Sequence, residues 1–167
     1  MGKKVAIESP CRIMGANHIS IKRDSFIGSD SWIAALPHLN NTESSKNAEL
    51  IAIGENVCIS GHCTITAVNS VKIEDHVLIA RYVYISDHSH EYRDTVVPIK
   101  NQGIKNIKAV HIKKGAWIGQ GAVICPGVTI GANSVVGANS IVRIDVPDHS
   151  VAAGNPASII KKRKKEQ

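Results

Sequence analysis

Residues 112–142 read IKKGAWIGQGAVICPGVTIGANSVVGANSIV, and an aliphatic residue returns at every sixth position of this stretch. The repeated positions are Ile112, Ile118, Ile124, Ile130, Val136 and Val142. A period of six is neither the 3.6 of an α-helix nor the alternation of a single strand. Glycine and asparagine recur in between, and both tolerate the positive φ of tight corners. The stretch therefore predicts an all-β fold of short, flat strands with one corner per six residues.

The same spacing recurs earlier in groups of three, and extra residues follow each third position. The groups are Ile21, Ile27 and Ile33, then Ile53, Ile59 and Ile65, then Ile73, Ile79 and Ile85. If three hexads close one triangular coil, stacked coils bury a continuous aliphatic column. Every insertion, including those at about residues 36–50 and 87–109, then leaves from the same corner. Loops gathered at one corner build a wall where a site can form.

Composition limits the interior, the compartment and the partners. The 167-residue chain is 43% hydrophobic but only 4% aromatic, so aliphatic residues must fill the core. No apolar run approaches the roughly 18 residues of a membrane span, and no signal-peptide pattern follows the start, so we expect a cytoplasmic protein without an integral membrane segment. The four cysteines lack zinc-site spacing, so no metal is expected. The net charge of +6 suits a phosphorylated cofactor or an anionic sugar polymer. Nucleic-acid binding is not favoured, because the sequence has neither a recognition-helix pattern nor aromatic residues interleaved with the basic ones.

Three segments carry a family resemblance: GAWIG at residues 115–119, PGVTIG at 126–131 and VAAGNPA at 151–157. They resemble the C-terminal signature of hexapeptide-repeat acyltransferases, in the branch of maltose, galactoside and polysaccharide O-acetyltransferases. The resemblance implies a left-handed parallel β-helix that forms a homotrimer, with acetyl-CoA as co-substrate in a cleft between subunits. We expect the β-helix acyltransferase domain at residues 1–146. A C-terminal extension at 147–167 is expected to form a short tail or helix with a basic end.

The insertion after residue 86 opens with DHSHEYR at residues 87–93. Acetyl transfer to a hydroxyl needs a base, because an alcohol is a weak nucleophile at neutral pH, and histidine exchanges protons in that range. The motif is similar to the family's histidine-containing loop, which implies that His88 is the general base. Either Asp87 or Glu91 is expected to orient its imidazole. The alternative is that His88 only stabilises the loop by hydrogen bonding.

Two further sets of residues are expected to bind acetyl-CoA and the acceptor. Trp117 is placed beside the cofactor by the resemblance, although it equally suits an interface. The outer wall lacks bulky side chains at Gly119, Gly121, Gly137 and Ala138, so a pantetheine arm can follow the backbone there. The cationic side chains expected to bind the nucleotide phosphates are Arg143, Lys161 and Lys162. The glycines also suit coil corners. For the acceptor the candidates are His90, Ser60, Asn69, Tyr92 and Arg93. Ser60 and Asn69 stand where sugar acetyltransferases carry an asparagine and an aspartate, which leaves the acceptor's identity open.

The pattern predicts transfer of acetyl from acetyl-CoA to a hydroxyl of a sugar or a surface-polysaccharide precursor. One alternative is an N-acetyltransferase that acts on an amino sugar. Another is a metalloenzyme of the γ-carbonic-anhydrase type, which needs three convergent histidines, two of them separated by four residues, and no pair here has that spacing. The last alternative is a non-catalytic β-helix scaffold, which needs neither a loop base nor a cofactor cleft.

Overall fold

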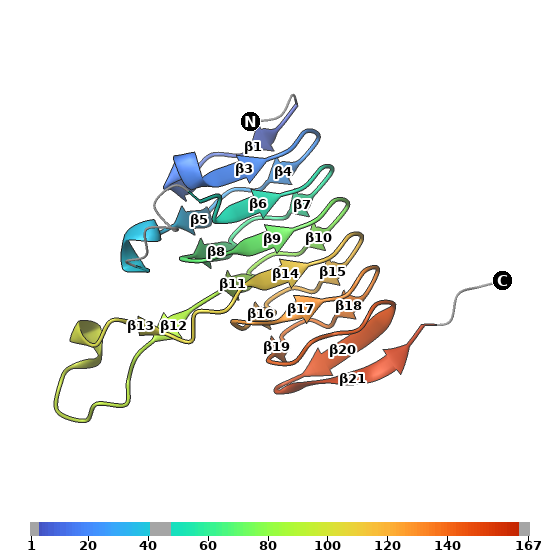
Figure 1. Ribbon diagram of the computed structural model, residues 1–167. Coiled ribbons are helices and arrows are strands. Elements are labelled where there is room, and N and C mark those ends of the chain that lie inside the picture. The colour runs from blue at the N-terminus through green and yellow to red at the C-terminus, as the bar shows by residue number, and fades with distance from the viewer. Residues whose placement is uncertain (1–3, 41–47, 164–167) are drawn as a thin grey trace.

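Three parallel sheets form the walls of a triangular prism in the computed structural model, which describes residues 4–40 and 48–163 (Figure 1). We call the sheets A, B and C, their outer surfaces faces A, B and C, and the edges where they meet corners AB, BC and CA. Part of the insertion at about 36–50, and Lys164 and Lys165 of the basic end, lie outside the described residues.

The chain visits the three sheets in turn, and each sheet stacks equivalent strands of successive coils. Sheet A contains β1 (Ala6–Ile7), β4 (Phe26–Ile27), β7 (Cys58–Ile59), β10 (Leu78–Ile79), β15 (Trp117–Ile118), β18 (Val135–Val136), β20 (Ser150–Gly154) and β21 (Ala157–Lys162). Sheet B contains β2 (Cys11–Met14), β5 (Ser31–Ala35), β8 (Thr64–Ala67), β11 (Tyr84–Ser86), β16 (Val123–Ile124) and β19 (Ile141–Val142). Sheet C contains β3 (Ile19–Ile21), β6 (Ile51–Ile53), β9 (Val71–Ile73), β14 (Val110–Ile112) and β17 (Thr129–Ile130).

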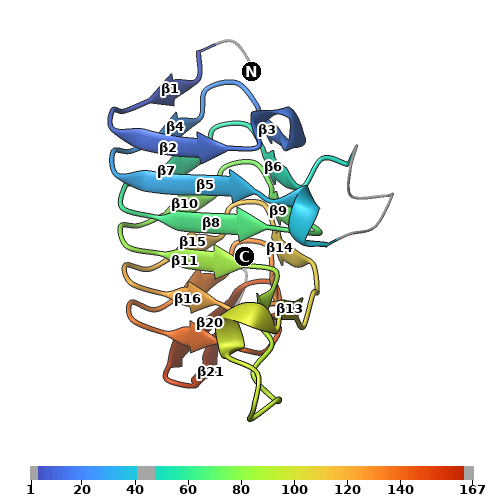
Figure 2. The same ribbon diagram turned by 90° about the vertical axis from the view of Figure 1, so that its left-hand side faces the viewer.

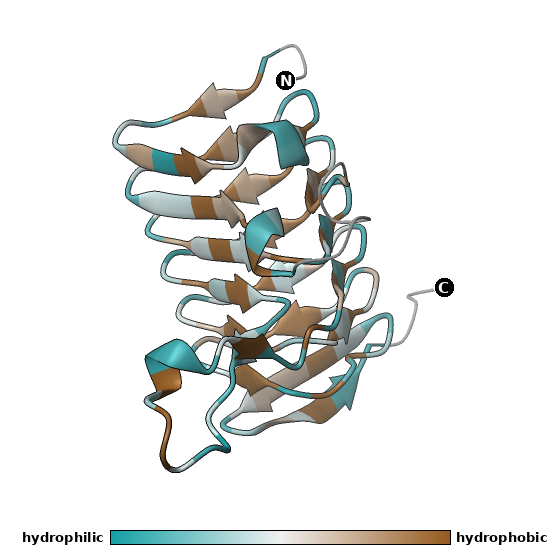
Figure 3. Ribbon diagram, turned by 60° about the vertical axis from the view of Figure 1, so that its left-hand side comes forward, coloured by the Kyte–Doolittle hydropathy of each residue, from teal (hydrophilic) through white to brown (hydrophobic). Residues whose placement is uncertain are grey.

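The six-residue repeat forms the core, as the sequence predicts. In sheet A, Ile59 pairs with Ile79, and Ile79 pairs in turn with Ile118. All three side chains are completely buried, and apolar positions recur at equivalent places in successive strands (Figure 3). Each repeat residue therefore packs on its equivalent in the next coil, and the interior is one aliphatic column.

The insertions leave the prism at one corner. The extra residues after β5, β8 and β11 all follow a strand of sheet B and precede a strand of sheet C, so the expected gathering at a single corner, BC, is confirmed for the described chain. The longest insertion, residues 87–109, projects from this corner as an arm (Figure 2). The arm contains the antiparallel strands β12 (Ser89–His90) and β13 (Ile104–Lys105), and the short helix η3 (Ile99–Asn101).

The other described helices are η1 (Ala16–His18) and η2 (Pro37–Leu39), each a single 3-10 turn. No helix in residues 4–40 or 48–163 is long and apolar enough to cross a membrane.

The C-terminal extension forms strands and not the short tail or helix that the sequence predicts. β20 adds to sheet A beside β18, and β21 returns antiparallel to β20. Ala152 and Ala157 are buried against the column. The turn Gly154-Asn155-Pro156 breaks any helical periodicity, and the apolar segments on either side continue the sheet. The pair thus covers the end of the core and limits edge-to-edge association.

Candidate functional site

Asp87 and His88 follow β11 directly and lie at corner BC. His88 Nδ1 is 2.8 Å from Asp87 Oδ1, and the side chains are 12% and 0% exposed. A carboxylate accepts hydrogen bonds, so Nδ1 is assigned as the protonated nitrogen. His88 Nε2 has no protein partner in the part of the chain described here. The pair can therefore present a basic nitrogen to a substrate hydroxyl.

The turn between β8 and β9 holds the carboxylate of Asp87. The Val68 N–H donates to both oxygens at 3.0 and 3.2 Å, and the N–H groups of Asn69 and Ser70 each donate to Oδ2 at 2.7 Å. Hydrogen bonds to a carboxylate are stronger than neutral ones, and here three consecutive amides converge on one group. The preceding coil thus fixes Asp87, which in turn orients His88.

Two contributors to this arrangement are absent from the residues that the sequence predicted. The backbone of 68–70 acts through amide groups, which carry no side-chain signature. Ser86, a buried residue of β11, donates its hydroxyl to the His88 carbonyl at 2.9 Å, and its Oγ lies 3.2 Å from His88 Nδ1. Ser86 could have been recognised because it is a polar residue at a buried position of sheet B, where it pairs with Thr66. Asn69, predicted to bind the acceptor with its side chain, reaches the site through its backbone N–H.

Glu91 belongs to a separate ionic cluster on the arm. Its carboxylate accepts from Arg93 Nε at 3.0 Å and from Lys105 Nζ at 3.1 Å. The Arg93 guanidinium holds the pKa of Glu91 well below its usual range. Lys105 Nζ also lies 3.3 Å from the centroid of the Tyr92 ring. Of the two carboxylates considered for orienting His88, the structure joins Asp87 to the imidazole and pairs Glu91 with cations.

A cleft of about 660 Å³ lies between the arm and the coils below it at corner BC. It brings together the predicted acceptor residues Tyr92 and Arg93 and the predicted phosphate ligand Arg143, and its other lining residues are Ser89, Lys105, Asn106, Cys125 and Pro126. Burial raises the pKa of the Cys125 thiol, so this cysteine is uncharged at neutral pH. His90 is exposed on β12. The cleft is cationic and adjoins the residue that follows His88.

The remaining predicted residues lie on other parts of the prism. Trp117 is 48% exposed on face A, within the column of strands that contains β10 and β18. Ser60, Gly119, Gly121, Gly137 and Ala138 lie at corner AB, between strands of sheet A and sheet B. Lys161 and Lys162 are exposed on β21. Within one chain, strands of sheet B separate the corner AB residues from His88.

The backbone favours glycine at two of these positions, at one because the next coil lies close and at the other because φ is positive. A Cβ on Gly119 would lie 2.6 Å from Ala138 N, and Gly121 has φ 70°. We therefore expect Gly119→Ala to destabilise the fold by about 1–3 kcal/mol, measured as a lower Tm in thermal unfolding. Gln120→Ala, an exposed change at the same corner, is the control and is expected to leave Tm unchanged. An unchanged Tm with weaker acetyl-CoA binding would instead assign Gly119 to the cofactor.

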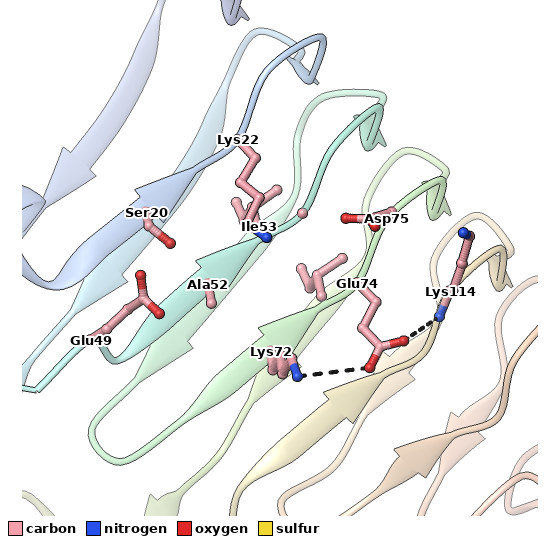
Figure 4. Close-up of a pocket in the computed structure, with 11 residues that line it drawn as sticks. Ser20, Lys22, Glu49, Ala52, Ile53, Lys72, Glu74, Asp75 and Lys114 are labelled. Carbon is pink, nitrogen blue, oxygen red and sulfur yellow. Dashed lines mark hydrogen bonds and ion pairs between the residues drawn. The ribbon is translucent and has the colours of Figure 1, made fainter. Parts of the chain in front are cut away.

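A second hollow, of about 350 Å³, lies on face C. Ala52 forms its floor between Ser20 and Lys72, and the ammonium groups of Lys22 and Lys114 stand near its rim (Figure 4). Its lining includes none of the residues predicted for catalysis, cofactor or acceptor. Among the described residues, no three histidine, cysteine, aspartate or glutamate side chains are grouped so as to hold a metal ion.

Comparison with known proteins identifies relatives of the chain. Residues 109–143 match the profile of the bacterial transferase hexapeptide family (six repeats). The chain is 32% identical over 159 residues to the probable acetyltransferase Rv3034c of Mycobacterium tuberculosis, over 87% of this chain and 52% of that protein. It is 37% identical over 119 residues to the putative lipopolysaccharide biosynthesis O-acetyl transferase WbbJ of Escherichia coli, over 68% of this chain and 61% of that protein. The chain thus spans 52% and 61% of the lengths of these curated relatives.

Solved structures share the fold over nearly the whole chain. A maltose O-acetyltransferase from Clostridium difficile is 30% identical with a TM-score of 0.68, over 99% of this chain and 70% of that one. VCA0836 from Vibrio cholerae, a hexapeptide-repeat acetyltransferase complexed with acetyl-CoA, is 34% identical with a TM-score of 0.63, over 71% of this chain and 63% of that one. These likenesses and the three parallel sheets confirm the left-handed parallel β-helix. The chain therefore belongs to the hexapeptide-repeat acyltransferases, in the branch of the maltose, galactoside and polysaccharide O-acetyltransferases.

Proposed function

We propose that the protein transfers the acetyl group of acetyl-CoA to a hydroxyl of a sugar or of a surface-polysaccharide precursor, with His88 as general base. The observation that carries the proposal is the Asp87–His88 pair, in which a buried carboxylate held by three backbone amides lies 2.8 Å from the imidazole. The relatives support the reaction class, because WbbJ and the maltose enzyme are named as O-acetyltransferases. The acetyl-CoA complex of VCA0836 supports the donor.

The proposed mechanism is a direct transfer. His88 Nε2 accepts the proton of the acceptor hydroxyl while its oxygen attacks the thioester carbonyl carbon. Asp87 stabilises the imidazolium that forms, through its contact with Nδ1. Collapse of the tetrahedral intermediate breaks the carbon–sulfur bond, and the imidazolium returns its proton to the thiolate of CoA. The products are the acetyl ester and free CoA, and no acyl-enzyme is required.

Face A supports assembly into a homotrimer. The outward side chains of strands β4, β7, β10, β15, β18 and β20 there are apolar, and this column consists of Phe26, Cys58, Leu78, Trp117, Val135 and Val151. Leu78 and Trp117 are 43% and 48% exposed in the single chain. Large contiguous apolar patches usually mark interfaces. In the proposed trimer a neighbouring subunit covers face A, and each active site lies between two subunits.

A shared site explains why the cofactor candidates lie away from His88 in one chain. In the proposal, Trp117 and the low-bulk surface at Gly119, Gly121, Gly137 and Ala138 face the His88 of an adjacent subunit. The pantetheine arm of acetyl-CoA runs along that surface, and Arg143, Lys161 and Lys162 bind the phosphates at the nucleotide end.

Mixed trimers test the shared site. His88→Ala removes the base, and Ala138→Trp fills the exposed surface at corner AB, so each variant alone is expected to be inactive. Random co-assembly at equal amounts is expected to restore about one quarter of the parental activity, because about one interface in four combines two intact halves. Tandem-tag purification shows that mixed trimers have formed. Mixed trimers without activity would show that the site lies within one chain.

The reaction itself is tested by a screen of sugars and nucleotide sugars with acetyl-CoA, in which release of free thiol is followed and the product is analysed by mass spectrometry and NMR. An ester product supports the proposal. An amide formed only with amino sugars would favour an N-acetyltransferase instead. The cytoplasmic location stays a prediction, which cell fractionation tests.

A further inference from the structure

A cluster of aromatic and charged side chains at corner AB has no role in the function proposed so far. The rings of His62 and Tyr82 stack with centroids 4.9 Å apart and an interplanar angle of 26°. His62 Nε2 lies 3.5 Å from Asp30 Oδ2, and the Arg81 guanidinium lies 5.7 Å from the Tyr82 centroid. Tyr82 is still 54% exposed, so much of the stack is open to solvent.

The backbone conformation at Tyr82 is unusual for a tyrosine. Asp30, His62 and Tyr82 occupy equivalent corner positions of successive coils, with φ of 58°, 51° and 62°. Gly121 and Asn139 occupy the same corner further along, and glycine, asparagine, aspartate and histidine all adopt positive φ more readily than tyrosine. Tyr82 is the only tyrosine, tryptophan or phenylalanine with positive φ among the described residues. Backbone strain of this kind is concentrated at functional sites.

We propose that the His62–Tyr82 stack is the platform on which a pyranose ring of the acceptor rests, supplied to each active site by the partner subunit. The C–H groups of a sugar ring are attracted to the electron-rich face of an aromatic ring. The Asp30 carboxylate lies beside the His62 ring and the Arg81 guanidinium lies over the Tyr82 ring, so they can accept from and donate to the hydroxyls of a sugar at the stack. This inference rests on the proposed function, because it assigns the acceptor side of that shared site.

The topology places the platform at the height of the base. Tyr82 precedes β11 and His88 follows it, so the two belong to one coil but lie at two different corners, AB and BC. Rotation about a threefold axis parallel to the coil stack preserves height. Corners AB and BC flank face B. If face B of every subunit points away from the threefold axis, corner AB of one subunit meets corner BC of its neighbour. Tyr82 of the partner subunit then faces His88 across the groove.

The same closure predicts which faces touch. With face B outward, the apolar face A of one subunit must pack against face C of the next. The hollow above Ala52 on face C lies at the height of strands β4 and β7, so it leaves room for outward side chains of face A such as Phe26 and Cys58 (Figure 4). The polar rim of this hollow, with Lys22 and Lys72, surrounds the contact.

The deciding variant is Tyr82→Asn, which removes the ring and inserts a residue suited to positive φ. We expect the KM for the acceptor to rise at least about tenfold, because the sugar ring loses the aromatic face on which it rests. The KM for acetyl-CoA is expected not to rise, and the Tm is expected not to fall. Tyr82→Phe keeps the ring and is expected to retain the parental KM for the acceptor. A purely structural tyrosine predicts the reverse for Tyr82→Asn, a lower Tm with unchanged KM values.

Binding is measured directly by saturation-transfer NMR with methyl glycosides of glucose, galactose and mannose. Transfer from the aromatic protons to the sugar ring protons, lost in Tyr82→Asn and kept in Tyr82→Phe, supports the platform. Absence of transfer to every glycoside, or equal transfer in Tyr82→Asn, would overturn it. If His88→Ala abolishes acetyl transfer while Tyr82→Asn leaves the acceptor KM unchanged, only the platform fails. If His88→Ala retains transfer, the proposed function itself fails.

Discussion

His88→Ala is expected to lower kcat by about 10²–10⁴-fold, the usual contribution of a positioned general base. Without Nε2 to take up its proton, the hydroxyl of the acceptor sugar stays protonated, so its oxygen attacks the thioester poorly. The measurement is the steady-state rate of acetyl ester formation, with kcat separated from both KM values.

The fold of this variant is expected to survive, because the His88 side chain contacts Asp87 and Ser86 at the corner and is outside the aliphatic column. Thermal unfolding and binding of acetyl-CoA are therefore expected to match the parent. His90→Ala removes an exposed histidine two residues away and serves as the matched control, with kcat within a few-fold of the parent. Acetyl transfer by His88→Ala at the parental rate would remove His88 from the mechanism.

Asp87→Asn is expected to have the second large effect, a fall in kcat of about 10²–10⁴-fold, by analogy with the cost of a mis-set histidine tautomer in serine proteases. The amide cannot accept at every position that the carboxylate serves. If its NH₂ faces His88 Nδ1, the ring proton moves to Nε2 and the base is lost. If its NH₂ faces the turn, the N–H groups of residues 68–70 lose part of their acceptor.

The same substitution is expected to destabilise the protein by about 1–3 kcal/mol, because buried donors are left unsatisfied. Chemical denaturation measures this loss, and the pH profile of kcat reports the change at the base. Glu91→Gln is the control: it disturbs Arg93 and Lys105 on the arm, but has no contact with the imidazole. We expect it to keep kcat within a few-fold, and a loss as large as that of Asp87→Asn would reassign the orienting role to Glu91.

The hexapeptide period predicted the fold almost completely, because one spacing determines strand length, corner position and buried face together. Ile59, Ile79 and Ile118 are repeat positions in the sequence and stacked core residues in the structure. The C-terminal strand pair was not predicted. Its segments around Gly154 lack the six-residue spacing, and their place beside β18 depends on the exposed edge that sheet A leaves there.

The site was predicted only in part. The motif at residues 87–93 identified His88, but sequence spacing could not choose between Asp87 and Glu91, since both stand close to it in the chain. The choice depends on the turn at 68–70, whose amides come from another coil. Likewise, Arg143 was predicted with Lys161 and Lys162 as a ligand of the cofactor's phosphates, whereas the structure places it in the cleft beside Tyr92, because strand β19 ends at corner BC. Contacts between coils decide such questions, and a linear pattern does not contain them.

Anchoring of Asp87 by the turn at 68–70 separates two tasks that a single loop usually performs. The reactive imidazole takes its orientation from the stacked coils through Asp87, whereas residues 89–107 of the arm contribute one wall of the adjoining cleft. Exchanging that part of the arm for one of another length or composition should therefore retune acceptor preference and leave the base in place. The position directly after His88 is therefore suited to grafting another loop, because the residues before it hold the base and the residues after it are expected to contact the acceptor.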